Sequence, residues 1–529
     1  MKALRQPYEQ DWREISKYAQ PTRSRFLNSE TNRNTKKPTI YDGQSIRSFR
    51  TLTGGMTSGL SSSSRPWFKL ATYDADLMET QEGKEWLTEA EKRLYAMLAS
   101  SNFYSAAKTG YSELGLFGTE ACVMVEHPRH GFVCHALTAG EFWIALDDAM
   151  MPGALYRRVP MTVLQAVQSF KGAVSQRVRS AYDRSNYETL VDVFHAIEPN
   201  PDREPGRADG HNKPWQSIWW DETDSGDALL RHSGFDEQPF WAPRWDTTGS
   251  DVWGSSPAME ALPDMRELQL QAKRKAEATD YHVWPEIVTN PNMKLKRQAK
   301  AVTSAANVDK DSVLVPYQVP YQAIAAIRED VEDCRRAIDA ASYAELFMAI
   351  TNMQGIQPRN IEEIASRNEE KLTQLGPVIE RVNKEKLAVA IDRAFGIMSR
   401  GGLLPPVPQA LSGVELKIEF VSILTQMQRM IGIGQIERTA SFVGGLIAAF
   451  PEIGDKLNTD GMVDEYADRA GAPAKIIRSD DDVEAMRAAR AQAQNAERIA
   501  AMAPAAKDGA DAARIMTEIA DAGGMGLAA

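Results

Sequence analysis

Two stretches of helical periodicity, separated by about forty residues without it, dominate the hydrophobic pattern of this chain. In the first, from Pro257 to about Tyr281, the apolar residues share one stripe and most charged residues lie off it. In the second, from Tyr321 to Ile350, apolar positions alternate steps of three and four, a repeat that suits lengthwise packing against other helices. The two stripes are Ala261, Met265, Leu268, Ala272 and Ala276, and Ile324, Ile327, Val331, Cys334, Ile338 and Ala341.

Helices of this length would span roughly 35 and 45 Å at about 1.5 Å per residue. That is more than a compact domain usually needs, and it favours a pair of arms capped by the segment between them. The same periodicity is also typical of a helical hairpin buried in the core of an ordinary large protein. The pattern alone leaves both interpretations open.

The chain before residue 120 is predicted to be mainly helical. Trp12, Ile15 and Tyr18 recur at helical spacing before Pro21 ends the pattern. A polar, basic loop is expected at 28–39, and further helices at 45–60, 83–101 and 103–116. The run GGMTSGLSSSSRPWFKL, residues 54–70, combines turn-forming residues with an aromatic anchor and is interpreted as a packed loop.

Strand-like alternation replaces the helical period between residues 121 and 253. The segments ACVMVE, FVCHAL, EFWIAL and ALYRRV, separated by turn residues, predict an antiparallel sheet. A helix pair is expected at 161–182, and LVDVFHAIEP, QSIWWD and ALLRH resume the strand pattern. Residues 83–253 are therefore predicted to form an α+β unit. Its tryptophans indicate a core or an interface: Trp86, Trp143, Trp215, Trp219, Trp220, Trp241, Trp245 and Trp253.

Beyond the second arm, a long helix is predicted from Asn360 to Arg400, with a kink at Gly376–Pro377 and its end at Gly401. VELKIEF, residues 414–420, alternates as a strand should and could return to the earlier sheet. Residues 423–529 are expected to be helical and increasingly rich in alanine. One helix would run from Ser479 to about Met502, and the last residues are too small to expect order.

Composition narrows the class of protein. The 529 residues predict more than one structural unit, and 43% hydrophobic with 25% charged residues is ordinary soluble composition. Three unpatterned cysteines indicate neither disulfides nor a metal knuckle and favour a reducing compartment. No apolar signal core or run of eighteen apolar residues occurs, which argues against secretion and membrane spanning. The net charge of −11 does not suggest tight wrapping of nucleic acid.

Motifs for catalysis, metal or cofactor binding do not emerge. The sequence has no GxxxxGK[ST], HExxH, GxSxG or CxxC pattern, so we expect no enzyme, no cofactor and no metal. His127 and His130 lack a third ligand of convincing spacing. Asp147 and Asp148 are adjacent and are interpreted as a turn rather than as an acid and base pair.

Charged clusters on and between the arms allow two interpretations each. The acidic residues of the second arm suit a solvated helix face, or a charged wall if they lie inside a ring: Glu329, Asp330, Glu332 and Asp333. The basic cluster between the arms suits either a solvated loop or a contact for acidic protein or nucleic acid: Lys294, Lys296, Arg297 and Lys300.

Several motifs in order resemble the head-to-tail connector, or portal, proteins of short-tailed podovirus-type phages. They are GGMTSGLSSSSRPWFKL, SNFYSAAKTGYSELGLFGTEACVMVE, SPAMEALPDMRELQ and LGPVIERVNKEKLAVAIDRAFGIMSRGGLLPP, and the resemblance runs to about residue 430. It implies a structural, non-enzymatic subunit of a twelve-membered ring at one capsid vertex, assembled in the host cytoplasm. Another ring-forming phage tail or adaptor protein is the alternative.

The resemblance also implies a division of the chain and a set of partners. The expected parts are a wing at 1–253, a first stem helix at 254–285, a clip at 286–319, a second stem helix at 320–350, a channel loop at 351–360, a wing helix and strand at 361–425, and a crown and tail at 426–529. Terminase would pump double-stranded DNA through the central channel, and a tail adaptor would dock later. Major capsid and scaffolding proteins are the other expected partners, and no membrane is involved.

Candidate site residues follow from that division. The clip candidates are the four basic residues named above. The candidate DNA contacts in the channel are Lys273, Arg274, Lys275, Arg328 and Arg359. The candidate channel loop is Met353, Gln354, Gly355, Ile356, Gln357 and Pro358. Twelve copies at −11 each would carry about −132, so we expect DNA to pass a largely repulsive wall with weak, sequence-independent phosphate contacts.

Overall fold

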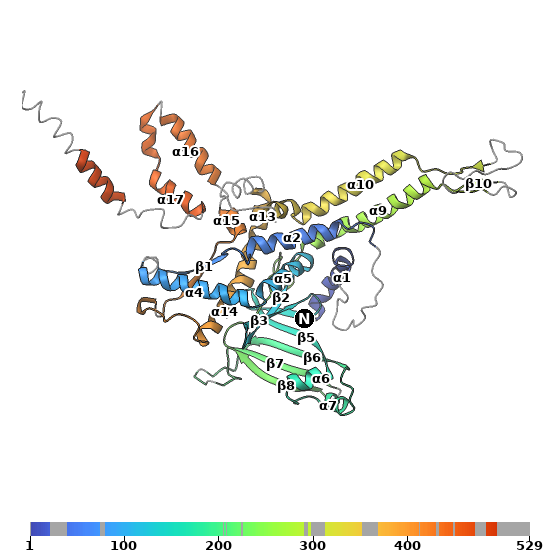
Figure 1. Cartoon of the computed structure of the whole chain (residues 1–529), viewed down its shortest axis with the longest axis horizontal. Coiled ribbons are helices and arrows are strands. Elements are labelled where there is room, and N and C mark those ends of the chain that lie inside the picture. Colours follow the sequence, from blue (N-terminus) through green and yellow to red (C-terminus); the bar gives the residue numbers. More distant parts are fainter. Residues whose placement is uncertain are drawn as a thin grey trace, which may run out of the picture. The chain divides into compact units, whose positions relative to one another are not determined.

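The computed structural model describes most of the chain, and it divides into two compact units, Met1–Ile431 and Gly432–Ala529. The described residues are 2–21, 40–74, 80–204, 206–207, 209–223, 226–289, 295–297, 313–351, 369–411, 413–429, 433–447, 450–470 and 483–494. Helices and strands are both present and helices predominate, which confirms the predicted α+β class (Figure 1).

The helices of the first unit lie close to their predicted positions. Before the long hairpin, they are α1 (Lys2–Ala19), α2 (Gln44–Leu60), α4 (Gln81–Ser100), α5 (Phe103–Phe117), α6 (Val163–Ser169) and α7 (Gln176–Asp183). Capping explains several of these starts, because Thr80, Thr162 and Ser175 each accept a hydrogen bond from a backbone N–H of the first turn. The predicted loop at 28–39 lies outside the described residues.

The predicted antiparallel strands form two sheets instead of one. Their bounds are β2 (Ala121–His127), β3 (Gly131–Leu137), β4 (Phe142–Leu146), β5 (Pro152–Thr162), β6 (Leu190–Pro199), β7 (Trp215–Thr223), β8 (Gly226–Phe235) and β9 (Phe240–Trp241). One sheet has the order β3-β2-β9 and the other is a meander, β4-β5-β6-β7-β8. The chain leaves the first sheet after β3 through Gly140, whose φ of 95° suits glycine. The helix pair α6 and α7 contacts the meander and encloses a small core with Trp219.

The packed loop predicted at 54–70 is confirmed only at 61–67, where Ser61 and Trp67 are buried. Residues 54–60 belong to α2, and Phe68–Thr72 form β1, which pairs antiparallel with β12 (Leu416–Phe420). The predicted strand at 414–420 therefore exists, but its partner is β1 and not the earlier sheet. Tyr95 fixes this arrangement, because its hydroxyl accepts from the backbone of Trp67 and Phe68 and donates to the Phe68 carbonyl.

A π-helical turn interrupts the long helix that follows the hairpin. The described part consists of α13 (Glu369–Val382), the π turn Asn383–Ala388 and α14 (Val389–Arg400), with Pro377 inside α13. The π turn thus begins six residues after Pro377, where a kink was predicted. The wider turn brings consecutive residues, Glu385, Lys386 and Leu387, into the protein interior.

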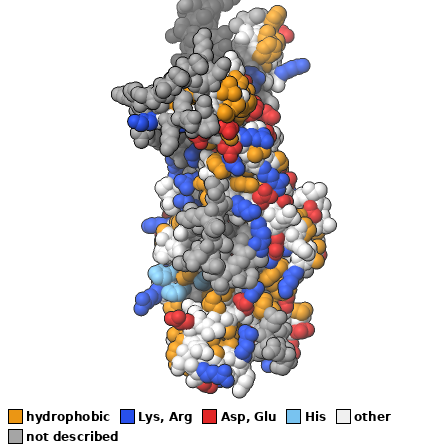
Figure 2. Space-filling view, turned by 90° about the vertical axis from the view of Figure 1, so that its right-hand side faces the viewer, with side chains coloured by type: hydrophobic (Ala, Val, Ile, Leu, Met, Phe, Trp, Pro, Cys, Tyr) orange, Lys and Arg blue, Asp and Glu red, His pale blue; other side chains and the backbone are white. Residues whose placement is uncertain are grey.

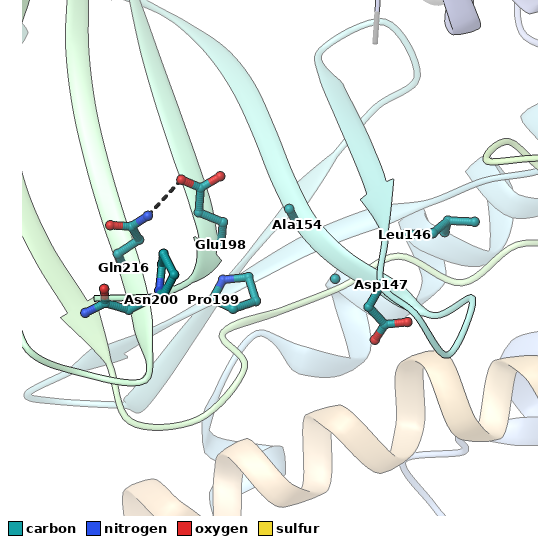
Figure 3. Close-up of a pocket in the computed structure, with 9 residues that line it drawn as sticks. Leu146, Asp147, Ala154, Glu198, Pro199, Asn200 and Gln216 are labelled. Carbon is teal, nitrogen blue, oxygen red and sulfur yellow. Dashed lines mark hydrogen bonds between the residues drawn. The ribbon is translucent and has the colours of Figure 1, made fainter. Parts of the chain in front are cut away.

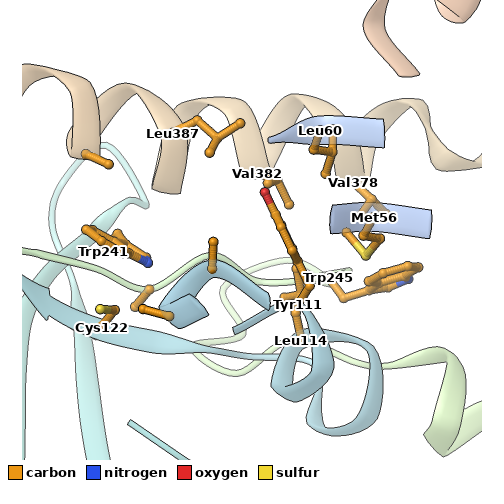
Figure 4. Packing of buried hydrophobic residues seen from close by; sticks show 14 of the residues in the cluster. Met56, Leu60, Tyr111, Leu114, Cys122, Trp241, Trp245, Val378, Val382 and Leu387 are labelled. Atoms are coloured by element: carbon orange, nitrogen blue, oxygen red, sulfur yellow. The ribbon is translucent and has the colours of Figure 1, made fainter. Parts of the chain in front are cut away.

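Two buried ion pairs hold this π turn against the rest of the first unit. The Lys386 ammonium lies 2.8 Å from the Glu120 carboxylate, and Glu385 pairs with Arg244, also at 2.8 Å. Figure 4 shows the apolar surroundings, where Tyr111 points from α5 towards the long helix and Trp241 lies between that helix and Cys122. Of the eight tryptophans in 83–253, five are buried and the others are partly buried, which confirms their predicted role in a core.

The second unit is helical where it is described, as predicted. Its elements are α16 (Ile433–Ile447), a 3₁₀ segment (Pro451–Lys456), α17 (Thr459–Ala470) and a helical stretch at 483–494. The expected flexible tail lies outside the described residues. Within the part of the chain that the structure describes, no helix is long and apolar enough to cross a membrane.

Candidate functional site

The two predicted arms form a long helical hairpin that leaves the body of the first unit (Figure 1). The first arm comprises α8 (Pro257–Glu260) and α9 (Leu262–Val283), and the second is α10 (Tyr321–Ala341), which lies beside α9. At about 1.5 Å per residue, α9 and α10 each span roughly 32 Å. At the tip, β10 (Val288–Thr289) pairs antiparallel with β11 (Val313–Leu314).

The second arm is shorter than predicted, because it breaks at Ser342 and Tyr343. Tyr343 has a φ of 53°, a left-handed conformation that ends α10, and the chain continues as α11 (Ala344–Thr351). Packing of α11 against α2 explains the change of direction. Phe347 fills a notch at Gly55, where a β-carbon would lie only 2.2 Å from the phenylalanine ring.

Burial of the apolar stripes falls from the base of the hairpin towards its tip. Near the base, Met265, Leu268, Val331 and Ile338 are fully buried. Towards the tip, Ile324 and Ile327 are only partly buried and Ala276 is exposed. Large apolar side chains at the tip are exposed as well: Tyr281, Val283, Trp284, Val288, Leu314, Val315, Tyr317 and Tyr321. The described residues of the distal half therefore form no hydrophobic core within one chain.

A polar clamp, made of Asp42, Gln44, Gln269, Arg335 and Asp339, fixes the base of the hairpin. The Asp42 carboxylate accepts a hydrogen bond from Arg335 at 2.6 Å, and its carbonyl accepts one from Gln269 at 2.8 Å. Gln44 donates to Asp339 at 2.8 Å. Sequence reasoning missed this clamp. The Asp-Gly pair before α2 signals a turn, but nothing in the sequence points to its distant partners.

The structure describes four of the five candidate DNA contacts. Lys273, Arg274 and Arg328 are exposed on the hairpin, and Lys275 is half-buried. The Lys273 ammonium lies 3.7 Å from the Glu277 carboxylate one turn further on. Arg359 lies outside the described residues, as does the whole candidate channel loop, Met353, Gln354, Gly355, Ile356, Gln357 and Pro358.

The candidate clip residues are described only in part. Lys296 and Arg297 are exposed, whereas Lys294 and Lys300 lie outside the described residues. The Arg297 guanidinium stacks over the Trp284 ring, 5.0 Å from its centroid, and donates to the Pro285 carbonyl at 2.8 Å. Arg297 is thus attached to the tip of α9, and its charge lies beside an exposed aromatic side chain.

The acidic residues Glu329, Asp330, Glu332 and Asp333 are all exposed, as a solvated helix face requires. Two of them pair within α10, because Arg335 donates to Glu332 at 2.6 Å and Arg336 donates to Asp333. The bond to Asp333 raises the pKa of Arg336. On the face in Figure 2, Lys and Arg side chains are interspersed with Asp and Glu.

A hollow of about 430 Å³ opens where strands β4 to β7 end (Figure 3). Glu198 and Gln216 lie on one side of it and are joined by a hydrogen bond of 2.8 Å. Across from them, the Asp147 carboxylate accepts from the Met151 backbone, which confirms the predicted turn at Asp147–Asp148. Both carboxylates already have protein partners. The described residues contain no group of three His, Cys, Asp or Glu side chains placed to hold a metal ion.

Comparison with known proteins agrees with the resemblance seen in the sequence. Residues 1–477 match the family described as bacteriophage head to tail connecting protein. The chain is 36% identical over 516 residues to the portal protein of Salmonella phage epsilon15, covering 96% of this chain and 93% of that protein. It is also 36% identical over 522 residues to the probable portal protein of Bordetella phage BPP-1, covering 95% and 91%.

The chain is also similar to a chain of a solved structure, the neck of an empty GTA particle computed with C6 symmetry. The match covers 82% of this chain and 90% of that chain. Its TM-score of 0.36 and identity of 11% are too low to support an argument about the fold. The sequence relationships need no such support, because they extend over nearly the whole chain. This chain belongs to the family of bacteriophage head to tail connecting proteins.

Proposed function

We propose that the protein is a phage portal, a ring of copies at one capsid vertex through which double-stranded DNA enters during packaging and later leaves. The family implies assembly into a ring with capsid and tail partners. Twelve copies is the stoichiometry we propose. The observation that supports a ring most directly is the hairpin, whose distal apolar residues are exposed in a single chain and become buried when copies assemble.

The parts of the chain take their roles from this proposal. The hairpin at 254–285 and 320–350 is the stem around the channel, and 286–319 is the clip. Residues 351–360 form the channel loop, 1–253 and 361–425 the wing, and 426–529 the crown and tail. Each copy contributes one hairpin, and a ring of such hairpins would leave its central axis open for a DNA duplex.

We propose weak, sequence-independent contacts between the DNA backbone and cations of the stem and channel loop. The candidates remain Lys273, Arg274, Lys275, Arg328 and Arg359. The net charge of −11 per copy repels DNA and weakens these contacts, and tight binding would stall transport. Removing a true contact should change DNA packaging or retention and leave ring assembly intact.

The clip is the proposed docking surface for the terminase large subunit during packaging and for the tail adaptor afterwards. Its described residues combine the exposed apolar side chains Val288, Leu314, Val315 and Tyr317 with the exposed cations Lys296 and Arg297, and Lys294 and Lys300 complete the basic cluster in the sequence. Major capsid and scaffolding proteins would contact the wing, and assembly would take place in the host cytoplasm before the portal becomes part of the virion.

Electron microscopy of the purified protein tests the proposal. We expect rings with a central hole wide enough for a DNA duplex, and compact monomers at micromolar concentration would contradict it. Deleting residues 290–310 tests the clip separately. Rings and capsid incorporation should persist, while capture of the tail adaptor in a pull-down should be lost; retained capture would exclude this docking surface.

A further inference from the structure

The hairpin has two outer faces that differ in charge. Residues Met265, Leu268, Val331 and Ile338 mark the inner faces, where α9 and α10 pack together. At 100° per residue, Leu270, Arg274 and Tyr281 lie on the opposite side of α9, whereas Ala326, Glu329 and Asp333 lie on the opposite side of α10. Both outer faces are exposed in the single chain.

The outer face of α9 is apolar and basic towards the tip. Leu270 and Tyr281 are about half exposed, at 48% and 52%. Arg274, between them, is exposed and forms no ion pair in the described structure. Lys273 is next to it and pairs with Glu277 on the same helix, so Arg274 is the cation of this face whose charge has no ion-pair partner in the described structure.

The outer face of α10 is acidic at the same height. Glu329 is exposed and forms no ion pair in the described structure, and Asp330 follows it. The Asp333 carboxylate accepts a hydrogen bond from Arg336 on the same helix. Glu329 is therefore the carboxylate of this face whose charge has no ion-pair partner in the described structure. The two helices therefore offer complementary charge.

Arg274 and Glu329 are level with each other along the hairpin. Arg274 lies nine residues before the end of α9, and Glu329 lies eight residues after the start of α10. Both are thus about 12–14 Å from the ends of the helices at the tip. If the hairpins stand parallel to the ring axis, rotation about that axis keeps the two residues at one height, so Arg274 of one copy can meet Glu329 of the next.

We propose that neighbouring copies join through these two faces, with α9 of one copy against α10 of the next. A head-to-tail ring needs two different, complementary surfaces on each subunit, and the hairpin provides both at one height. Arg274 and Lys273 face Glu329 of the next copy, and Leu270 and Tyr281 lose their exposure there. This inference rests on the proposed ring.

The consequence is a different role for two candidate DNA contacts. Lys273 and Arg274 lie in the seam between copies and are not available to the duplex. Lys275 and Arg328 lie on neither outer face. Of the candidate DNA contacts that the structure describes on the hairpin, Lys275 and Arg328 therefore remain available to the channel.

Charge reversal tests the seam, with ring formation measured by mass photometry and electron microscopy over a dilution series. Arg274→Glu should raise the concentration for half assembly by about tenfold, and so should Glu329→Lys. Combining both substitutions in one chain should restore assembly, because every seam then regains an opposite pair. Lys275→Glu, an equal change of charge one residue away, is the matched control and should assemble like the wild type.

The outcomes separate this inference from the proposed function. Absence of rings in the wild type would overturn both. Wild-type rings together with normal assembly of Arg274→Glu would overturn the seam alone, as would a double variant that is no better than the single ones. Circular dichroism of each variant at low concentration identifies misfolding; if Arg274→Glu misfolds, Arg274→Gln should still weaken assembly, and normal assembly of that variant would overturn the seam.

Discussion

Removing the ammonium of Lys386 should be among the most damaging single changes in the first unit. Lys386 is fully buried and Glu120 is 1% exposed. Besides the ion pair, the Lys386 Nζ lies 3.6 Å from the centroid of the Tyr111 ring, and Trp241 donates to Glu120 at 3.0 Å. In Lys386→Met, the carboxylate would keep the Trp241 N–H and lose its countercharge. Breaking a buried pair in this way costs about 3–5 kcal/mol of stability.

The charge of Glu120, rather than lost packing, should account for most of that cost. Methionine has nearly the length of the lysine stem and can fill the same space. Adding Glu120→Gln removes the unpaired charge and keeps an oxygen for the Trp241 N–H. The double variant should therefore be more stable than Lys386→Met by about 2 kcal/mol or more, since replacing both members of a buried pair is often nearly neutral.

The pH dependence of the single variant gives an independent check. Burial raises the pKa of the Glu120 carboxyl, and the Lys386 ammonium opposes this shift in the wild type. Without Lys386, the folded protein binds a proton more readily than the unfolded chain does. Stability of Lys386→Met should accordingly rise as the pH falls from 8 towards 5.

Urea unfolding followed by tryptophan fluorescence measures these differences, because Trp241 contacts Glu120 directly. A matched exposed pair provides the control: Lys384→Met removes an ion pair with Glu380 on the surface of the same helix and should change stability by less than about 1 kcal/mol. The reasoning fails if Lys386→Met costs no more than Lys384→Met, or if Glu120→Gln adds to its cost.

Two further predictions concern packing and protonation. Gly55→Ala should destabilise the contact of α2 with α11 by about 1–3 kcal/mol, because the new methyl group meets Phe347, whereas Gly54→Ala, with open space around it, should not destabilise it; thermal denaturation of the two variants compares them. Burial lowers the pKa of His195 well below 6.5, and the nearby Arg157 adds to this, so the stability that neutral His195 contributes is present above pH 6.5 and is lost as the pH falls below it. His195→Gln should flatten that part of the pH profile in urea unfolding, and an unchanged profile would contradict the assignment.

Local periodicity predicted most elements, because it reports which side of a segment is buried. The stripes of α9 and α10 and the alternation in β2 to β8 were read correctly for this reason. The break at Tyr343 was not predicted. Its surroundings, AASYAELF, favour a helix throughout, and the turn depends on Phe347 meeting Gly55 almost 300 residues earlier.

Pairings between distant segments could not be predicted from the sequence, for a similar reason. The strand Leu416–Phe420 was predicted, but its partner Phe68–Thr72 follows a serine run that looks like a loop. The π turn has no local signature, because the residues that stabilise it, Arg244 and Glu120, are brought to it by the fold. Candidate cations were found easily, yet a sequence does not show which side of a hairpin faces a neighbour.

The polar clamp at the base of the hairpin imposes an order on folding. The helices α9 and α10 are joined by fewer than forty residues, so the hairpin can form quickly from contacts of its own. Its attachment instead links positions 227 to 295 residues apart, such as Gln269 with Asp42 and Gln44 with Asp339. During synthesis, Asp42 and Gln44 leave the ribosome long before their partners exist. The direction in which the hairpin points is therefore established only after residue 339 has been made.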